Sequence, residues 1–290
     1  YIPGEGFTKN ADDPLFYDII IVDEISMVDV PLFSALLSAV PAGTRLILVG
    51  DMDQLPPVGP GDVLRDIIES GVIPTVRLTE IFRQSERSRI VVNAHRINEG
   101  YMPELNEPSS DFRFESIPQQ DEVLARILQL CTHPAPVLDT REPIMDVQLL
   151  APMKAGTLGV HNLNARMQQA LNPSAPGKRE YGAGERKLRE GDRVMQMRNN
   201  YKVVWHKPGA SGVPEEGAGA FNGDLGTIAA INTETRRLSV LFDDQRLADY
   251  DFADLDEIDL AYCISIHKSQ GSEFPIVVLP LHSGAPQLLT

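Results

Sequence analysis

The stretch Ile19-Ile20-Ile21-Val22-Asp23-Glu24 decides the fold, because a short β-branched run ends abruptly in two carboxylates. Such runs are typical of strands buried on both faces of a parallel sheet. A second apolar run, 46–49, ends in Gly50-Asp51. Ligands of open parallel sheets bind at the carboxyl ends of the strands. We therefore predict an α/β fold in which the ends of 19–22 and 46–49 carry the chemistry.

The segments around these two runs alternate between helical and strand-like patterns, and we predict three βα units in one open parallel sheet. The third strand is expected at 75–78. Helices are expected at 30–40, 62–70 and 87–98.

A second domain is predicted after the Pro- and Ser-rich loops that begin at 106. Its helices are expected at 121–130 and 163–170. Its buried strands of parallel type are expected at 147–150, 260–266 and 275–280. Short strands with turn residues between them are expected at 193–198, 226–231 and 238–242. They indicate a small antiparallel barrel inserted between 188 and 254. The Gly-rich stretch 208–219 is interpreted as a mobile loop.

The composition excludes a disordered chain, a membrane span and a disulfide scaffold. The 290 residues are 42% hydrophobic, and no run approaches the ~18 apolar residues of a membrane helix. The two cysteines, Cys131 and Cys263, lie far apart in sequence, which favours a reducing compartment such as the cytoplasm. The net charge is −15, but 178–202 is rich in Lys and Arg, and local charge decides where a polyanion binds.

The residues at the two strand ends suit phosphoryl transfer. Asp23 can hold the water shell of Mg²⁺, and Glu24 can orient or deprotonate an attacking water. A polar strand end that meets a helix N-cap is the alternative for this motif alone. In the following loop three prolines restrict the backbone and hold Gln54 beside the first site.

At four places the sequence resembles motifs II to V of superfamily 1 DNA helicases of the RecD/TraA type, which move 5′ to 3′ and include the exodeoxyribonuclease V alpha subunit. The matching stretches are Ile-Val-Asp-Glu-Ile-Ser-Met-Val at 21–28, Val-Gly-Asp-Met-Asp-Gln-Leu-Pro-Pro-Val at 49–58, Leu-Thr-Glu-Ile-Phe-Arg-Gln at 78–84 and Ser-Ile-His-Lys-Ser-Gln-Gly-Ser-Glu at 265–273. The resemblance covers almost the whole chain, and agreement of four motifs in order is improbable by chance.

The resemblance implies a P-loop NTPase (RecA-like) fold. Residues 1–105 would be part of motor domain 1A, with a remnant of hairpin 1B at 1–10. Motor domain 2A would comprise 106–187 and 255–290, and the SH3-like barrel 188–254 would be subdomain 2B. The alternative for the first residues is a frayed terminus.

The resemblance also implies roles for single residues in binding ATP and Mg²⁺. Asp23 would bind the metal through water, Glu24 would activate water, and Gln54 would sense the γ-phosphate. Arg83 would stabilise the transferring phosphoryl group, unless it forms a salt bridge with Glu80 or Glu86. Two further nucleotide-binding residues are Gly271 and Glu273.

The DNA-binding residues that the resemblance implies are Lys154, His267, Lys268, Ser269 and Gln270. A turn after a buried strand can present amides, a hydroxyl and an ammonium to phosphates. For Lys154 a solvated lysine is an equally good interpretation. Phe221 is interpreted as a residue of the barrel core, and Trp205 is left open between the core and a single-strand channel.

The sequence departs from the family in two respects. It contains no Gly-x-x-x-x-Gly-Lys-Ser/Thr loop and no Arg-bearing motif VI. We therefore expect a fragment that is inactive alone, from a parent ATP-dependent helicase that acts on single-stranded and duplex DNA in repair or recombination. Nuclease or helicase subunits are possible partners. The alternative is a non-catalytic DNA-binding or assembly subunit.

Overall fold

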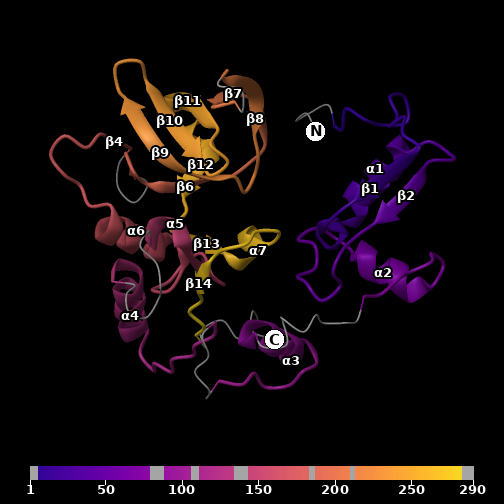
Figure 1. The fold of residues 1–290 in the computed structure, drawn as a ribbon, viewed down its shortest axis with the longest axis horizontal. Coiled ribbons are helices and arrows are strands. Elements are labelled where there is room, and N and C mark those ends of the chain that lie inside the picture. Colours follow the sequence, from indigo (N-terminus) through magenta and orange to yellow (C-terminus); the bar gives the residue numbers. More distant parts are fainter. Residues whose placement is uncertain are drawn as a thin grey trace. The chain divides into compact units, whose positions relative to one another are not determined.

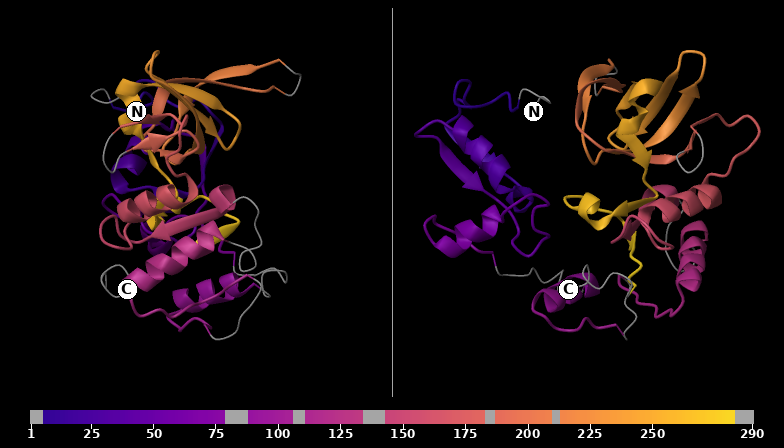
Figure 2. Two further views of the ribbon diagram at one scale, coloured as in Figure 1. Left: turned by 90° about the vertical axis from the view of Figure 1, so that its left-hand side faces the viewer. Right: turned by 180° about the vertical axis from the view of Figure 1, so that it is seen from behind.

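The computed structural model describes residues 6–78, 88–105, 111–133, 143–182, 187–209 and 213–282. They form two compact units, Tyr1–Ser116 and Ile117–Thr290. Figure 1 labels the elements of each unit, and Figure 2 shows them from two further directions. The predicted α/β class, with parallel sheets and an antiparallel sheet in the second unit, is confirmed. None of the described helices has the length and apolar character needed to span a bilayer.

The first unit is built on two parallel strands, β1 (Ile19–Val22) and β2 (Arg45–Leu48). Three of its helices begin at capping side chains: Asp29, Asp62 and Ser88 each accept a hydrogen bond from a backbone N–H of the first turn. The helical elements are η1 (Ile25–Met27), α1 (Val30–Ala39), α2 (Val63–Ser70) and α3 (Arg89–Asn98).

Two expectations about this sheet are wrong. The segment 75–78 forms no strand, and its apolar side chains are almost fully exposed, because no described strand lies beside it to supply hydrogen bonds. The prediction of three βα units therefore fails. Nor is β1 buried on both faces: Ile19 and Ile21, which share a face, are 50% and 65% exposed. Within the described residues only the opposite face of this sheet is partly covered.

The second unit contains the predicted strands of parallel type, which form a sheet in the order β13-β3-β14. β3 (Val147–Ala151) is central and buried throughout, between β13 (Cys263–Ser265) and β14 (Ile276–Val278). The helices of this part are α4 (Gln120–Thr132), α5 (Pro143–Asp146), α6 (Val160–Leu171) and α7 (Ile266–Ser269). Apolar side chains of α4 and α6 belong to the same core cluster as those of β3 and β13.

An antiparallel sheet of seven strands covers the predicted insertion, 188–254, and extends beyond it to Leu260, so Leu260 belongs to this sheet and not to the predicted parallel strand 260–266. In spatial order the strands are β12 (Ile258–Leu260), β6 (Arg193–Gln196), β9 (Leu225–Asn232), β10 (Arg237–Phe242), β11 (Leu247–Asp251), β7 (Asn200–Lys207) and β8 (Glu215–Ala220). The predicted barrel is an open sheet among the described residues, because its edge strands β12 and β8 do not pair with each other. A small hairpin, β4 (Glu180–Tyr181) with β5 (Leu188–Arg189), precedes it, and η3 (Phe252–Glu257) joins β11 to β12.

The mobile loop expected at 208–219 is wrong in its second half, where β8 pairs with β7. A Cβ on Gly217 would lie 2.4 Å from the ring of Trp205, so this glycine makes room for the indole. The Gly-rich sequence therefore reflects close packing of a large ring against a strand.

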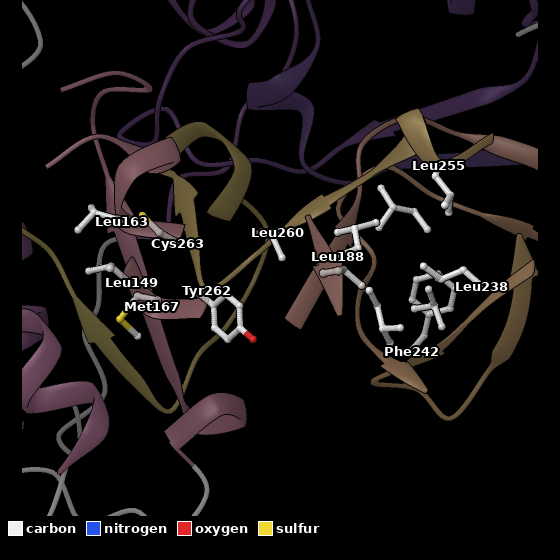
Figure 3. Packing of buried hydrophobic residues seen from close by; sticks show 14 of the residues in the cluster. Leu149, Leu163, Met167, Leu188, Leu238, Phe242, Leu255, Leu260, Tyr262 and Cys263 are labelled. Atoms are coloured by element: carbon white, nitrogen blue, oxygen red, sulfur yellow. The ribbon is translucent and has the colours of Figure 1, made fainter. Parts of the chain in front are cut away.

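The three-stranded parallel sheet and the seven-stranded antiparallel sheet of the second unit share one hydrophobic core. Figure 3 shows Leu149 and Leu163 of the parallel part and Leu238 and Phe242 of the antiparallel part, with Leu260 between them. The chain passes from one sheet to the other at this point, because β12 leads into β13 within three residues.

The buried carboxylate of Asp192 links the parallel and antiparallel parts of the second unit. Asp192 has no exposed surface, and its oxygens accept four hydrogen bonds. The donors are Asn172 Nδ2 (2.7 Å) and Tyr262 Oη (2.9 Å) to Oδ1, and Gln168 Nε2 and Arg189 N (both 2.6 Å) to Oδ2. Burial raises the pKa of Asp192 above its usual range, and these hydrogen bonds oppose the shift.

We predict that Asp192→Asn destabilises the second unit by at least about 2 kcal/mol, because an amide NH₂ would face two donors in place of an acceptor. Urea unfolding followed by circular dichroism measures the change. Asp249→Asn is the matched control, since Asp249 is exposed and accepts one hydrogen bond, from Ser239 Oγ. Equal stability of the two variants would contradict this role of Asp192.

Candidate nucleotide and nucleic-acid sites

The first candidate site lies at the carboxyl end of β1. Asp23 is exposed, and its Oδ1 accepts a hydrogen bond from the backbone N–H of Glu24 at 2.9 Å. Glu24 is half-buried and adopts the left-handed conformation, with φ 54° and ψ 39°. For a residue other than glycine this conformation is uncommon, and such strain is concentrated at functional sites. No sequence pattern indicated it.

Backbone hydrogen bonds hold the residue after β2 beside the carboxyl end of β1. Val49 N–H donates to the carbonyl of Val22 (2.8 Å), and Ile25 N–H donates to the carbonyl of Val49 (3.0 Å). Gly50 permits this approach, because a Cβ there would lie 2.7 Å from Ile25 Cγ2. The structure thus brings the loop 50–61 to Asp23 and Glu24, as expected for neighbouring parallel strands.

The loop that carries Gln54 is held at both ends. Near its start, Asp51 Oδ1 accepts from Asp53 N–H at 2.9 Å, and the carbonyl of Asp51 accepts from Gln54 N–H at 3.3 Å. Near its end, the carbonyl of Pro60 accepts from the N–H of Val30 at 3.1 Å. Gln54 is exposed on this anchored turn. Arg83, Glu80 and Glu86 lie outside the described residues.

The donors at this site fit a magnesium ion that keeps most of its water. Asp23 offers a hard oxygen ligand, and Mg²⁺ bound to nucleotides commonly takes only one or two carboxylates from the protein. Within the described ranges no group of three His, Cys, Asp or Glu side chains is arranged to hold a metal by itself. A metal here would therefore depend on phosphate oxygens and water for its other ligands.

The second candidate site follows β13. The predicted turn is a single helical turn, α7, in which Ser269 Oγ donates to the carbonyl of Ile266 at 2.8 Å. Gly271, with φ +73°, ends it. His267 is exposed, whereas Lys268 and Gln270 are half-buried. The exposed Glu273 lies farther on, in an open cleft of about 390 Å³ that also borders the antiparallel sheet.

The structure brings Lys154 and Lys268 together. The loops that carry them follow the paired strands β3 and β13, in which Ala151 lies opposite Ser265. Partial burial, and then the charge of Lys154, lower the pKa of Lys268. Lys268 Nζ donates to Oδ1 of Asn222, which lies between β8 and β9. Asn222 was not predicted from the sequence as a contact of Lys268.

The two aromatic residues considered for the single-strand channel have different surroundings. Phe221 is not a core residue as expected, because it is 43% exposed. It follows the end of β8, an edge strand of the sheet, and none of the described strands pairs with the outer side of β8. Trp205 is half-buried, packs against the core cluster and has the cations of Lys207 and Arg246 within 6 Å of its ring.

Three family models match the chain. Residues 163–242 match the SH3 domain of ATP-dependent RecD-like DNA helicases, 11–111 match an AAA domain, and 260–289 match the UvrD-like helicase C-terminal domain. Among solved structures, Bacteroides sp. Pif1 in complex with ADP-AlF4 aligns with 92% of this chain and 65% of that chain, at 23% identity and a TM-score of 0.35, which is too low to define a common fold.

The chain is similar along almost its entire length to curated helicase proteins. It is 34% identical to the ATP-dependent RecD2 DNA helicase of Deinococcus radiodurans over 286 residues, which are 99% of this chain and 35% of that protein. It is 28% identical to the RecBCD enzyme subunit RecD of Mycobacterium tuberculosis over 99% of this chain and 48% of that protein. The chain thus spans between about a third and a half of these relatives. In sequence the chain is therefore similar, along almost its entire length, to part of the RecD-like DNA helicases.

Proposed function

We propose that this chain is the central part of an ATP-dependent DNA helicase that couples ATP hydrolysis to 5′ to 3′ movement on single-stranded DNA and to duplex unwinding. The observation that carries the proposal is the pairing of β1 with β2, which fastens the Asp23-Glu24 pair to the loop of Gln54 at one sheet edge. Since the chain spans less than half of its first relatives, the activity is proposed for a protein that also contains a phosphate-binding loop.

In this proposal Asp23 orders the water shell of a magnesium ion, and Glu24 positions and activates the attacking water. The ion would neutralise phosphate charge when MgATP is bound. The left-handed backbone conformation of Glu24 supports a catalytic role, because strained backbone is concentrated at functional sites and sets the direction in which the side chain leaves the chain. Gln54 would sense the γ-phosphate and Arg83 would stabilise the phosphoryl group. Gly271 and Glu273 would complete the nucleotide contacts.

The same proposal assigns DNA backbone contacts to the second unit, through Lys154 and the residues of motif V, namely His267, Lys268, Ser269 and Gln270. The proximity of Lys154 and Lys268 supports this assignment and favours it over a solvated lysine, because two neighbouring ammonium groups suit a phosphodiester chain. Single-stranded DNA would bind there, and the duplex ahead of it would be unwound.

We further propose a setting for the protein. The domain bounds follow the family pattern: motor domain 1A at 1–105, domain 2A at 106–187 and 255–290, and subdomain 2B at 188–254. The two buried, unpaired cysteines suit a reducing cytoplasm. DNA repair or recombination, alone or with nuclease and helicase subunits, would be its task.

We predict that Glu24→Gln, in a protein that contains this chain and the phosphate-binding loop, lowers kcat for ATP hydrolysis by roughly 100-fold or more with little change in KM. The reason is that water activation acts in the transition state. Steady-state ATPase kinetics with single-stranded DNA present measure both constants. Glu69→Gln on the exposed side of α2 serves as control. If Glu24→Gln hydrolyses ATP as fast as the unmodified protein, the catalytic role of Glu24 is wrong, and the non-catalytic, DNA-binding alternative is favoured.

We predict that the 290-residue chain alone neither binds ATP at micromolar concentration nor hydrolyses it, because the sequence has no phosphate-binding loop. It should bind single-stranded DNA weakly, and the affinity should fall as salt rises, through local basic residues rather than the net charge of −15. Fluorescence anisotropy at two salt concentrations and a nucleotide titration test both statements. Salt-independent DNA binding would contradict the phosphate contacts.

A further inference from the structure

Two aromatic side chains lie exposed at one end of the antiparallel sheet. Tyr201 of β7 is 56% exposed and Phe221, just after β8, is 43% exposed. Their rings meet edge to face, with centroids 5.8 Å apart and an interplanar angle of 76°. Scattered exposed apolar residues are ordinary, but two contacting rings on a sheet whose other large residues are mostly buried form a distinct surface feature.

Hydrogen bonds of the adjoining turn hold Phe221 in place. Its backbone N–H donates to Asp224 Oδ2 at 2.9 Å, and its carbonyl accepts from Asp224 N–H at 2.9 Å. The Phe221 ring lies against Gly219, where a Cβ would be 3.0 Å from its Cζ atom. The backbone that carries the ring is therefore fixed before a ligand binds, which lowers the entropy cost of binding.

The turn that carries Phe221 is linked to the cations already described. Asn222, beside Phe221, accepts from Lys268 Nζ, and its N–H donates to Asn199 Oδ1 at 2.9 Å, two residues before Tyr201. The pKa of Lys268 also responds to the charge of Lys154. The nearest carboxylate of the turn, Asp224, is neutralised by an ion pair with Arg246 Nη2 at 2.7 Å.

We propose that Tyr201 and Phe221 form a stacking platform for the bases of single-stranded DNA whose phosphates contact Lys154 and Lys268. The proposal deepens the DNA-binding part of the proposed function and rests on it. Aromatic rings beside a cationic track are the usual means of binding single strands without sequence preference, since every base has a π-face. A duplex keeps its bases stacked inside, so this platform selects single strands. The antiparallel sheet would thereby contribute base contacts, and the parallel sheet phosphate contacts.

The test uses the full 290-residue chain and a labelled thymidine oligonucleotide of about 12 nucleotides, within the range that single-strand binding folds cover. Tyr201→Ala and Phe221→Ala should each raise Kd about 5-fold or more, as expected for loss of one stacked base. Tyr201→Phe keeps the ring and should bind like the unmodified chain. Val204→Ala is the matched control, because Val204 is equally exposed on the same strand. Thermal unfolding checks that every variant is folded.

Two further measurements separate stacking from phosphate binding. An oligonucleotide of the same length with abasic sites should bind the unmodified chain and Tyr201→Ala equally, because it offers no base to stack. Lys268→Ala should reduce the dependence of log K on log salt by about one phosphate contact, whereas Tyr201→Ala should leave it unchanged.

The outcomes distinguish the two proposals. If Lys268→Ala weakens binding while both aromatic variants bind like the unmodified chain, the stacking platform is wrong and the proposed DNA contacts stand. If the unmodified chain binds no oligonucleotide even at low salt, the proposed DNA contacts of this chain are wrong. The stacking platform, which rests on them, is then wrong as well.

Discussion

The four hydrogen bonds to the buried carboxylate of Asp192 hold the parallel and antiparallel parts of the second unit together. Two donors, Gln168 and Asn172, lie at the end of α6, and a third, Tyr262, lies just before β13. The loop of Lys154 leads into α6, and β13 leads into the helical turn of Lys268. Because Asp192 itself precedes β6, it fixes the antiparallel sheet relative to both lysine-bearing loops. The contact between Lys268 and Asn222 depends on that arrangement.

In the first unit, the pairing of two strands positions the candidate site residues. Parallel pairing of β1 and β2 places two strand ends side by side, and Gly50 removes the side chain that would separate them. The left-handed conformation of Glu24 then directs the chain into η1. Its backbone strain is sustained by the hydrogen bond from Ile25 N–H to Val49 and by the full burial of Ile25. A carboxylate at a fixed position is what activation of a water molecule requires.

Sequence reasoning predicted the elements whose signals are local. Helical patterns predicted α1, α2 and α3, and apolar runs predicted β1, β2 and β3. It failed where long-range packing decides: 75–78 lacks a neighbouring strand, and β8 depends on the ring of Trp205 against Gly217. The burial of Asp192 and the exposure of Phe221 follow from the order of strands, which residue patterns do not encode. The proximity of Lys154 and Lys268, by contrast, follows from two adjacent parallel strands.

The central claim is that loops of the parallel sheet and the edge of the antiparallel sheet bind one single strand together. Hydrogen–deuterium exchange of the full chain, with and without a single-stranded oligonucleotide, tests it most directly because the backbone of every participating segment is observed. The account predicts slower exchange on DNA binding at 152–158, 199–202, 219–223 and 266–271. Protection limited to the parallel-sheet loops, or confined to residues 6–116, would contradict it.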